Sequence, residues 1–386
     1  MVVVAVIVAP GVLRAGDGAT VTVSDAAGAS RALAEAKPKT TILLAPGRYG
    51  TIRATGVRGD EKRPVILRAA DPKTPPVFES VPVGVHLSKC AHLVLRDLVV
   101  RGAANNGINI DDGGDVENPS HHVVLENVRV SDVGPRGNRD ALKLSGVTDL
   151  VVRNCTFEGW GGSAIDMVGC HRVLVQASTF RGKEGFAQSN GVQAKGGSSA
   201  VTIRDCLFVE GGGRAVNLGG STGKPYFRPP GAAHEAKDVT VEGCRFTGSD
   251  VPVSFVGVDG AVVRYNTIYG PRRWVVRILQ ENTGEGMVPS RNGRFEHNVV
   301  VYNAASVRSP VSWGGGTQPE TFTFTSNLWY AEDAPGRSRP QLPAPETGGV
   351  YGTDPKVKPQ PDGELSTPRT GPTAKIGAGA QPATVK

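Results

Sequence analysis

Two segments of the chain, Leu150-Val-Val-Arg-Asn-Cys-Thr-Phe157 and Val201-Thr-Ile-Arg-Asp-Cys-Leu-Phe208, repeat one pattern: apolar-x-apolar-x-x-small-x-aromatic. Apolar residues that alternate with polar ones indicate a strand with one buried face. The interval between copies varies from 22 residues (Phe246 to Ile268) to 38 residues (Phe208 to Phe246). Further copies span Val173–Phe180, Val239–Phe246 and Ala261–Ile268, and looser ones end at Val100, Val130, Val300 and Trp329.

A constant motif at irregular intervals is typical of a β-helix, because each coil needs a minimum length and loops of any size can project from its turns. A propeller would repeat more regularly, and leucine-rich repeats would keep a fixed leucine frame. The sequence therefore predicts an all-β fold, a single-stranded right-handed parallel β-helix. We expect a short N-terminal helix, within Ser24 to Lys37, to cap the open end of this solenoid.

Stacked coils bring like residues into register, about 4.8 Å apart. Phe180 is predicted to lie buried between Phe157 and Phe208. The small position of the motif forms a second ladder, in which stacked asparagines can bond to the turn backbone and to each other. Its members are Val128, Cys155, Ser178, Cys206, Cys244, Asn266, Asn298 and Asn327.

Composition limits the possible partners. The chain of 386 residues has a formal net charge of +7, but its basic residues form no dense run, so nucleic acid binding is not predicted. A basic surface suits an acidic polysaccharide. Five cysteines without a CxxC pair favour neither a disulfide framework nor a zinc site. Buried thiols are the simpler interpretation, and a Cys206–Cys244 bridge is the alternative.

The chain divides into three parts. Residues 1–16 are largely apolar, which suggests a signal peptide and a secreted or periplasmic protein; a misassigned start codon or an ordinary strand are alternatives. The segment is too short to span a membrane. Residues 17–365 form the predicted β-helix domain, which we expect to be a monomer. Residues 366–386 have almost no large apolar side chains and are predicted to be disordered.

Two motifs carry a family resemblance. The coil pattern and the stem Thr41-Ile-Leu-Leu-Ala-Pro-Gly-Arg-Tyr49 resemble the pectate-lyase-like β-helix superfamily. Within it, Asn190-Gly-Val-Gln-Ala-Lys-Gly-Gly-Ser198 is similar to the alginate lyase and chondroitinase B type of polysaccharide lyase. This resemblance implies a catalytic lysine at Lys195 and an arginine one coil later. The chain departs from the pattern, because glutamate calcium ligands are replaced by Asn190 and Gln193 and the nearest arginine is Arg214.

The strands that precede the motif predict a polar face. Their outward residues fall into one column, Asn109, Lys143, Asp166, Gln193 or Lys195, and Asn217, with Asp140, Asn190 and Arg214 in a neighbouring column. A solvated face with ordinary cross-strand charge pairs is the alternative. The loop that begins at Ser221 would border this face. Two segments further along, Arg277–Glu281 and the stretch from Trp313, are candidates for distal subsites.

The lead hypothesis is a polysaccharide lyase that cleaves a uronic-acid polymer by β-elimination. Such a reaction needs a base and positive charge that neutralises the carboxylate. The predicted catalytic residues are Lys195, as the base, and Arg214. The predicted substrate-binding residues are Lys143, Gln193, Asn217, Tyr226 and Arg228. The predicted ligands of a Ca²⁺ ion are Asp140, Asp166 and Asn190.

Other functions remain open. A glycoside hydrolase would use Asp140 and Asp166 as general acid and base. A non-catalytic carbohydrate-binding protein would use the same face without turnover. His121 and His122 end an acidic loop that begins at Asp111, where a second calcium site competes with the simpler interpretation of a solvated loop.

Overall fold

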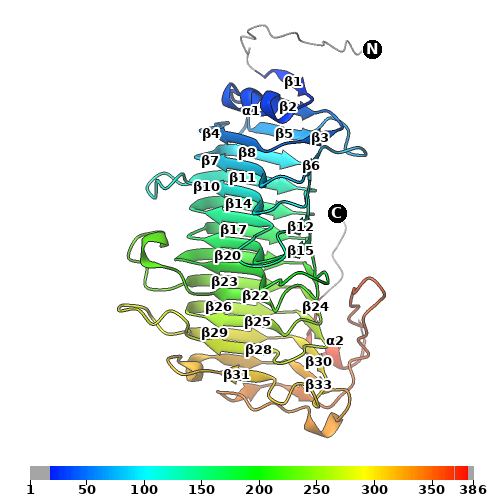
Figure 1. Ribbon diagram of the computed structural model, residues 1–386. Coiled ribbons are helices and arrows are strands. Elements are labelled where there is room, and N and C mark those ends of the chain that lie inside the picture. The colour runs from blue at the N-terminus through cyan, green and yellow to red at the C-terminus, as the bar shows by residue number, and fades with distance from the viewer. Residues whose placement is uncertain (1–17, 369, 381–386) are drawn as a thin grey trace.

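The computed structural model describes residues 18–368 and 370–380. Within them the chain winds into a tall stack of coils, each of which contributes strands to three parallel sheets (Figure 1). Along the chain, a typical coil supplies one strand to sheet C, then one to sheet A and one to sheet B. The predicted parallel β-helix is confirmed. The predicted signal peptide, residues 1–16, lies outside the described residues.

Sheet A has 13 strands and sheet B has 12. The strands of sheet A are β1 Thr20–Val23, β2 Thr41–Leu44, β5 Val65–Ala69, β8 Ala91–Arg96, β11 Ser120–Glu126, β14 Val147–Arg153, β17 His171–Gln176, β20 Ser198–Arg204, β23 Ala236–Glu242, β26 Val258–Arg264, β29 Arg291–Glu296, β32 Thr323–Thr325 and β34 Glu346–Thr347. The strands of sheet B are β3 Arg48–Tyr49, β6 Val77–Glu79, β9 Val99–Arg101, β12 Arg129–Val133, β15 Thr156–Trp160, β18 Thr179–Arg181, β21 Leu207–Val209, β24 Arg245–Thr247, β27 Thr267–Tyr269, β30 Val299–Tyr302, β33 Leu328–Ala331 and β35 Val350–Tyr351.

Sheet C has 10 strands and carries the polar face that the sequence predicts. Its strands are β4 Ile52–Thr55, β7 Val83–Ser88, β10 Asn106–Asp111, β13 Leu142–Ser145, β16 Ser163–Val168, β19 Asn190–Lys195, β22 Arg214–Gly219, β25 Val251–Val256, β28 Val276–Leu279 and β31 Val311–Trp313. All the strand pairs within it are parallel, so equivalent residues of successive coils lie side by side.

The interior is built from ladders of like side chains. The rings of Phe157, Phe180 and Phe208 stack with centroid distances of 5.3 and 4.6 Å, and all three are fully buried, as predicted. The asparagine ladder is confirmed as well. The backbone amides of Asn266 and Asn298 donate to the side-chain oxygens of Asn298 and Asn327, at 3.0 and 2.9 Å.

The asparagine ladder satisfies polar groups of the turn by direct hydrogen bonds, as burial beside a continuous apolar core requires. The five cysteines are buried free thiols, so the alternative of a Cys206–Cys244 bridge is not found. No helix in the described part of the chain is long and apolar enough to cross a membrane.

The two ends of the solenoid are covered differently. Helix α1 (Ala26–Ala34) begins after Asp25, whose side chain accepts a hydrogen bond from the Gly28 amide at 2.7 Å, and it buries Ala29 and Leu33 over the first coils. This confirms the predicted cap. Three short 3-10 helices, η1 Lys224–Tyr226, η2 Pro319–Thr321 and η3 Pro335–Arg337, lie in loops.

The C-terminal segment differs from the predicted disordered tail. It forms α2 (Pro372–Ile376) beside the lower strands of sheet B (Figure 1). Ala378 and Leu365 are buried against the outer side chains Val299 and Leu328, and the amide of Ala380 donates to Thr267 Oγ1 at 2.9 Å. Small side chains suffice here because the sheet supplies the apolar surface, and composition alone does not show that. Residues 369 and 381–386 of the predicted tail lie outside the described residues.

Candidate functional site

The outer face of sheet C carries one continuous column of polar side chains, one from each of its strands from β10 to β28. Figure 1 shows loops that project along one flank of the solenoid, among them the cyan segment after β10 and the green segment after β22. Gln193, and not Lys195, is the member of the column from β19, and Lys195 pairs with Val168 two residues further along. The column reads Asn109, Lys143, Asp166, Gln193, Asn217, Ser254 and Arg277.

The middle of this polar column is buried although it faces outward. Asp166 and Asn217 are each 1% exposed, and Ser254 is fully buried. The loop between β22 and β23 closes over the ends of the strands, where the buried Glu235 carboxylate accepts hydrogen bonds from the backbone amides of Gly196 and Thr222, at 2.8 and 2.7 Å. The sheet therefore holds a set of polar groups that are largely withdrawn from water.

Two aspartates and two lysines form the centre of the column. Lys143 Nζ lies between two carboxylates: it forms an ion pair with Asp166 and lies 3.3 Å from Asp140 Oδ2. Lys195 Nζ lies 3.3 Å from the other oxygen of Asp166 and 3.3 Å from Gln193 Oε1. The lysine side chains are each 19% exposed, whereas the aspartate side chains are 1% exposed. The cluster offers ammonium groups to a ligand and keeps the carboxylates behind them.

The electrostatics of the cluster follow from this burial. Burial and the neighbouring charge of Asp166 raise the pKa of Asp140, against the opposing effect of Lys143. Burial alone would lower the pKa of Lys143, but Asp166 and Asp140 outweigh it and raise the pKa of that lysine. Lys143 is therefore held charged, as the counter-ion of two carboxylates that have no other cation between them.

These residues do not fit the predicted calcium site. Calcium is held by six to eight oxygen ligands, several of them carboxylates. Here the ammonium of Lys143 already lies between Asp140 and Asp166, and Lys195 balances the second charge. Asn190 is turned to its neighbours, with its amide nitrogen 3.4 Å from Ser163 Oγ and from Gln193 Oε1. The two lysines supply the positive charge that a calcium ion would supply.

A cluster of arginines lies further along the same face. Arg214 forms an ion pair with Glu281 at 2.6 Å and approaches Asn217 Oδ1 at 3.4 Å. Arg277 stacks on the ring of Trp274, with its guanidinium carbon 4.2 Å from the ring centroid. Burial, followed by the charges of Arg214 and Arg273, lowers the pKa of Arg277.

Two buried polar atoms of this region have no hydrogen-bond partner within the described residues: Ser254 Oγ and Arg277 Nε. Three guanidinium groups, those of Arg214, Arg273 and Arg277, are matched by the single carboxylate of Glu281. A region with excess positive charge and unpaired donors is suited to an anionic ligand such as a carboxylate.

The loop between β22 and β23 carries two predicted binding residues, Tyr226 and Arg228, which have different surroundings. Tyr226 is 62% exposed, so its ring is free to contact a ligand. Arg228 is instead bound to Asp112 through Nε and Nη2, with its side chain 11% exposed. This ion pair ties the loop to the segment after β10, 116 residues earlier, and so gives Arg228 a structural partner. The acidic loop at Asp111 is engaged similarly, since Asp111 accepts from Ser88 and Asn109.

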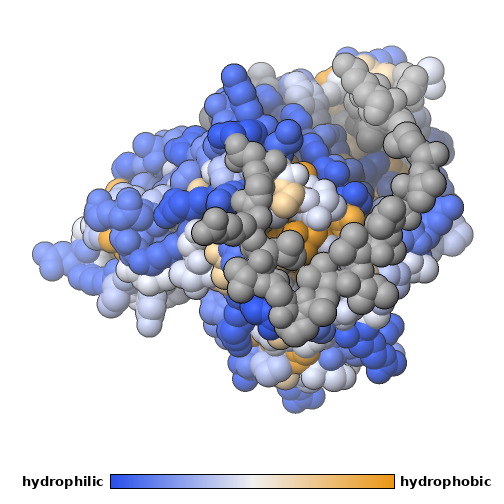
Figure 2. Space-filling model, turned by 90° about the horizontal axis from the view of Figure 1, so that it is seen from above, coloured by the Kyte–Doolittle hydropathy of each residue, from blue (hydrophilic) through white to orange (hydrophobic). Residues whose placement is uncertain are grey.

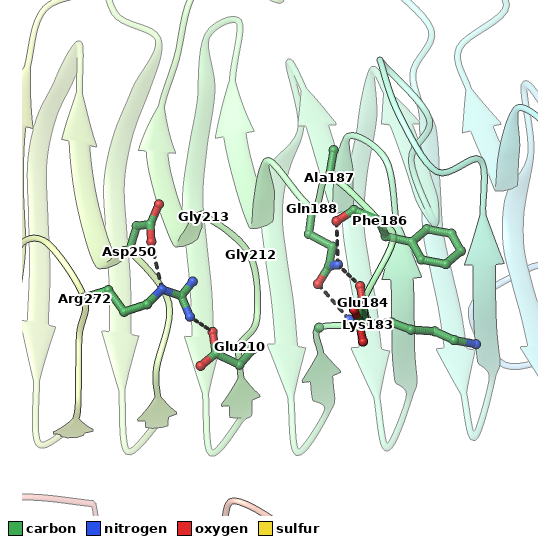
Figure 3. Close-up of a pocket in the computed structure, with 11 residues that line it drawn as sticks. Lys183, Glu184, Phe186, Ala187, Gln188, Glu210, Gly212, Gly213, Asp250 and Arg272 are labelled. Carbon is green, nitrogen blue, oxygen red and sulfur yellow. Dashed lines mark hydrogen bonds and ion pairs between the residues drawn. The ribbon is translucent and has the colours of Figure 1, made fainter.

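A separate cavity of about 340 Å³ lies at the opposite ends of β19 and β22. Figure 3 shows Arg272 between Asp250 and Glu210, and Gln188 bonded within its own turn. Arg272 is already paired with Glu210 and Asp250, and none of the predicted site residues lines this cavity. We therefore place the candidate site on the outer face of sheet C and not in this cavity.

The comparisons agree with this fold. Residues 83–228 match the family model described as a right-handed β-helix region, which confirms the predicted handedness. No curated protein matches the chain by sequence. The solved structure of an alginate lyase from Paenibacillus sp. str. FPU-7 is 18% identical, with a TM-score of 0.52, over 86% of this chain and 95% of that one.

A rhamnogalacturonan lyase is 11% identical with a TM-score of 0.54, over 89% of this chain and 92% of that one. The pectate lyase Pel9A is 16% identical with a TM-score of 0.50, over 77% and 73%. The chain thus has the right-handed β-helix fold of the pectate-lyase-like polysaccharide lyases. At these identities the likeness concerns the fold.

Sequence reasoning missed several residues of the site. Ser254 and Trp274 carry no motif, and Glu235 lies in a loop of no recognisable pattern. The strand register could have found Ser254, because it occupies the same position in β25 as Asn217 does in β22. Trp274 and Glu235 come from loops, whose course the repeat does not determine.

Proposed function

We propose that this protein binds an acidic polysaccharide along the outer face of sheet C and cleaves it by β-elimination. The observation that carries the proposal is the placement of Lys195 and Arg214 on adjacent strands of one face. Gln193 and Asn217 lie side by side between them. Lys195 Nζ lies 3.3 Å from Gln193, and Arg214 lies 3.4 Å from Asn217. The lyases of like fold support the same substrate class.

In this proposal each positively charged group has its own role. Arg214, with Arg277 beyond it, binds and neutralises the uronate carboxylate, which makes the neighbouring C–H more acidic. Lys195 then removes that proton. Gln193 and Asn217 orient Lys195 and Arg214, and the exposed ring of Tyr226 offers an apolar face to a sugar ring. Lys143 pairs with Asp140 and Asp166 and contacts the substrate only at its edge.

The ion pair between Lys195 and Asp166 bears directly on the role of base, because a charged ammonium cannot accept a proton. A polymer that covers this partly exposed pair would remove water from both groups. Asp166 Oδ1, 3.3 Å from the ammonium, is the acceptor placed to take the proton of Lys195 and leave a neutral amine. The net charge of the cluster is unchanged by that transfer. Asp166 is thus a positioning residue in this proposal.

Two other functions fit the geometry less well. A hydrolase would need Asp140 and Asp166 to reach a glycosidic oxygen, but both are 1% exposed behind Lys143. A non-catalytic binding protein is favoured by one observation, the ion pair that Lys195 forms with Asp166 at 3.3 Å.

The experiment is to incubate the purified protein with alginate, pectate and chondroitin and to follow the ultraviolet absorbance of the unsaturated product. A neutral polysaccharide serves as the control. An absorbance rise on one uronic-acid polymer supports the proposal. Reducing ends without unsaturation would indicate a hydrolase, and retention of a polymer without either product would indicate a binding protein. The proposal includes a secreted or periplasmic location and a monomer, since the substrate lies outside the cytoplasm and the whole face lies on one chain.

A further inference from the structure

Three histidines meet on the outer side of sheet A, away from the face of sheet C. His92 belongs to β8, and His121 and His122 belong to β11. Their ligand nitrogens all lie within 4.8 Å of one another, and they are the one group of three or more potential metal ligands in residues 18–368 and 370–380. His121 Nδ1 and His122 Nδ1 are 2.8 Å apart.

The turn geometry of the solenoid brings these rings together. His121 pairs with Ala91 of the previous coil, so His122 lies above His92. Both His92 and His122 have a positive φ, of 51° and 53°, in the left-handed region that non-glycine residues rarely adopt. Their rings stack at 4.5 Å, and the ring of His121 stands edge-on to both, at 5.3 and 5.0 Å.

Burial and nearby charges both act on His121. Burial, followed by His122, His92 and Arg58, lowers the pKa of His121, while Asp149 acts in the opposite direction. A neutral imidazole keeps the lone pair that a metal ion needs. Asp149 lies on the next coil, 3.8 Å from His122, and is held by Arg172 at 2.7 Å. That carboxylate supplies negative charge next to the three rings.

We propose that His92, His121 and His122 bind a divalent transition-metal ion, for which Zn²⁺ is the probe. Three imidazoles with an open fourth position are a common set for zinc. Calcium and magnesium are excluded by the same donors, since they prefer oxygen ligands. The ion would join two successive coils and so stabilise their stacking. This site is independent of the polysaccharide face, because its residues belong to a different sheet.

The test is calorimetric titration of the chelator-treated full-length protein with Zn²⁺ at neutral pH. We expect one tight site per chain and a rise in Tm on binding. His122→Ala and His121→Ala should each weaken binding by about 100-fold, since loss of a ligand costs at least as much as loss of its support. His122 is exposed, so its variant should fold as the wild type does.

The matched control is His297→Ala, since His297 contacts the carbonyl of Ile376 on another part of the solenoid. It should bind Zn²⁺ as the wild type does. The proposal is overturned if the wild type shows no saturable site, or if His121→Ala and His122→Ala bind Zn²⁺ as tightly as His297→Ala.

Discussion

The outer faces of sheets A and C are both built from parallel strands in register, but their charged side chains differ in exposure to water. On sheet A, charged residues of successive coils alternate in sign: Glu126 pairs with Arg96 on one side and Arg153 on the other, at 2.6 and 2.8 Å. These arginine side chains are 37% and 46% exposed. Viewed along the axis, the visible flanks of the molecule are mostly hydrophilic (Figure 2).

On sheet C, the equivalent charges are withdrawn from water. Asp166 and Asp140 are 1% exposed, and β16 is buried at every residue. A solvated ladder of pairs needs no function, because each pair contributes little and water can replace a partner. A buried set of unlike charges is costly to assemble, and such sets are concentrated at functional sites. This difference in the burial of charged side chains favours sheet C as the functional face, and the predictions below test it.

The largest expected effect is on activity. Lys195→Arg keeps the positive charge but cannot release its proton near neutral pH. If Lys195 is the base, kcat on the polymer that the wild type cleaves should fall by about 10²–10⁴-fold while polymer binding is retained. Steady-state kinetics and a binding titration measure the two separately. Lys183→Arg, at a lysine that pairs with Asp132 away from the face, is the matched control and should keep full activity. Near-normal turnover by Lys195→Arg would show that the residue acts only through its charge.

The next effect is on stability. Lys143→Met keeps the length of the side chain but removes the ammonium between Asp140 and Asp166, so that Lys195, at the other oxygen of Asp166, is the one cation of the cluster that remains. The free energy of unfolding at neutral pH should fall by about 3–5 kcal/mol, as when one partner of a buried pair is removed. Urea denaturation followed by circular dichroism gives this value. If the loss of unfolding free energy is no larger than for an exposed ion pair, water reaches Asp140 and Asp166. The outer faces of sheets A and C would then not differ in burial.

A smaller effect concerns pH. Because the pKa of Asp140 is raised in the folded state, the folded protein binds this proton more tightly than the unfolded chain does. Its contribution to stability is present below the ordinary aspartate pKa of about 4 and is lost as the pH rises through the higher folded value. Asp140→Asn removes this dependence. Its Tm should therefore fall less than that of the wild type between acidic and neutral pH, and parallel curves would contradict the prediction.

The smallest effect is expected on sheet A. Arg153→Met makes the same kind of change as Lys143→Met, at a pair that water reaches. Its cost should be below about 1 kcal/mol, which is the usual range for an exposed ion pair. Measuring both variants under one set of denaturation conditions sharpens the comparison. Equal losses would show that burial does not distinguish the faces.

Much of the fold and part of the site could be predicted from the chain. The apolar alternation identified the coils, and like residues at the motif positions predicted the phenylalanine and asparagine ladders. The part of the polar column from Asn109 to Asn217 was predicted except for one position, where Gln193 and Lys195 remained alternatives, and Ser254 was missed. Those two residues point to the same side of β19, and an alternating pattern cannot decide which one aligns with Asp166.

The partners of these residues were harder to predict. Arg228 was expected to bind substrate, yet it contacts Asp112 from a loop 116 residues away. A loop's course depends on what it packs against, and the repeat carries no such information. The tail after residue 365 was misjudged for the same reason, since the apolar surface that orders it belongs to β27, β30 and β33.

The sequence by itself determined the solenoid, its capping helix, its inner ladders and the sheet on which polar residues gather. These features follow from periodicity, because parallel coils must place equivalent residues side by side. Only the tertiary structure decided which charges are buried, that Lys143 takes the place between two carboxylates, and that His92 joins His121 and His122. Those outcomes depend on distances between separate coils and on the loops that cover them, and burial, not residue type, determines how strongly charges interact.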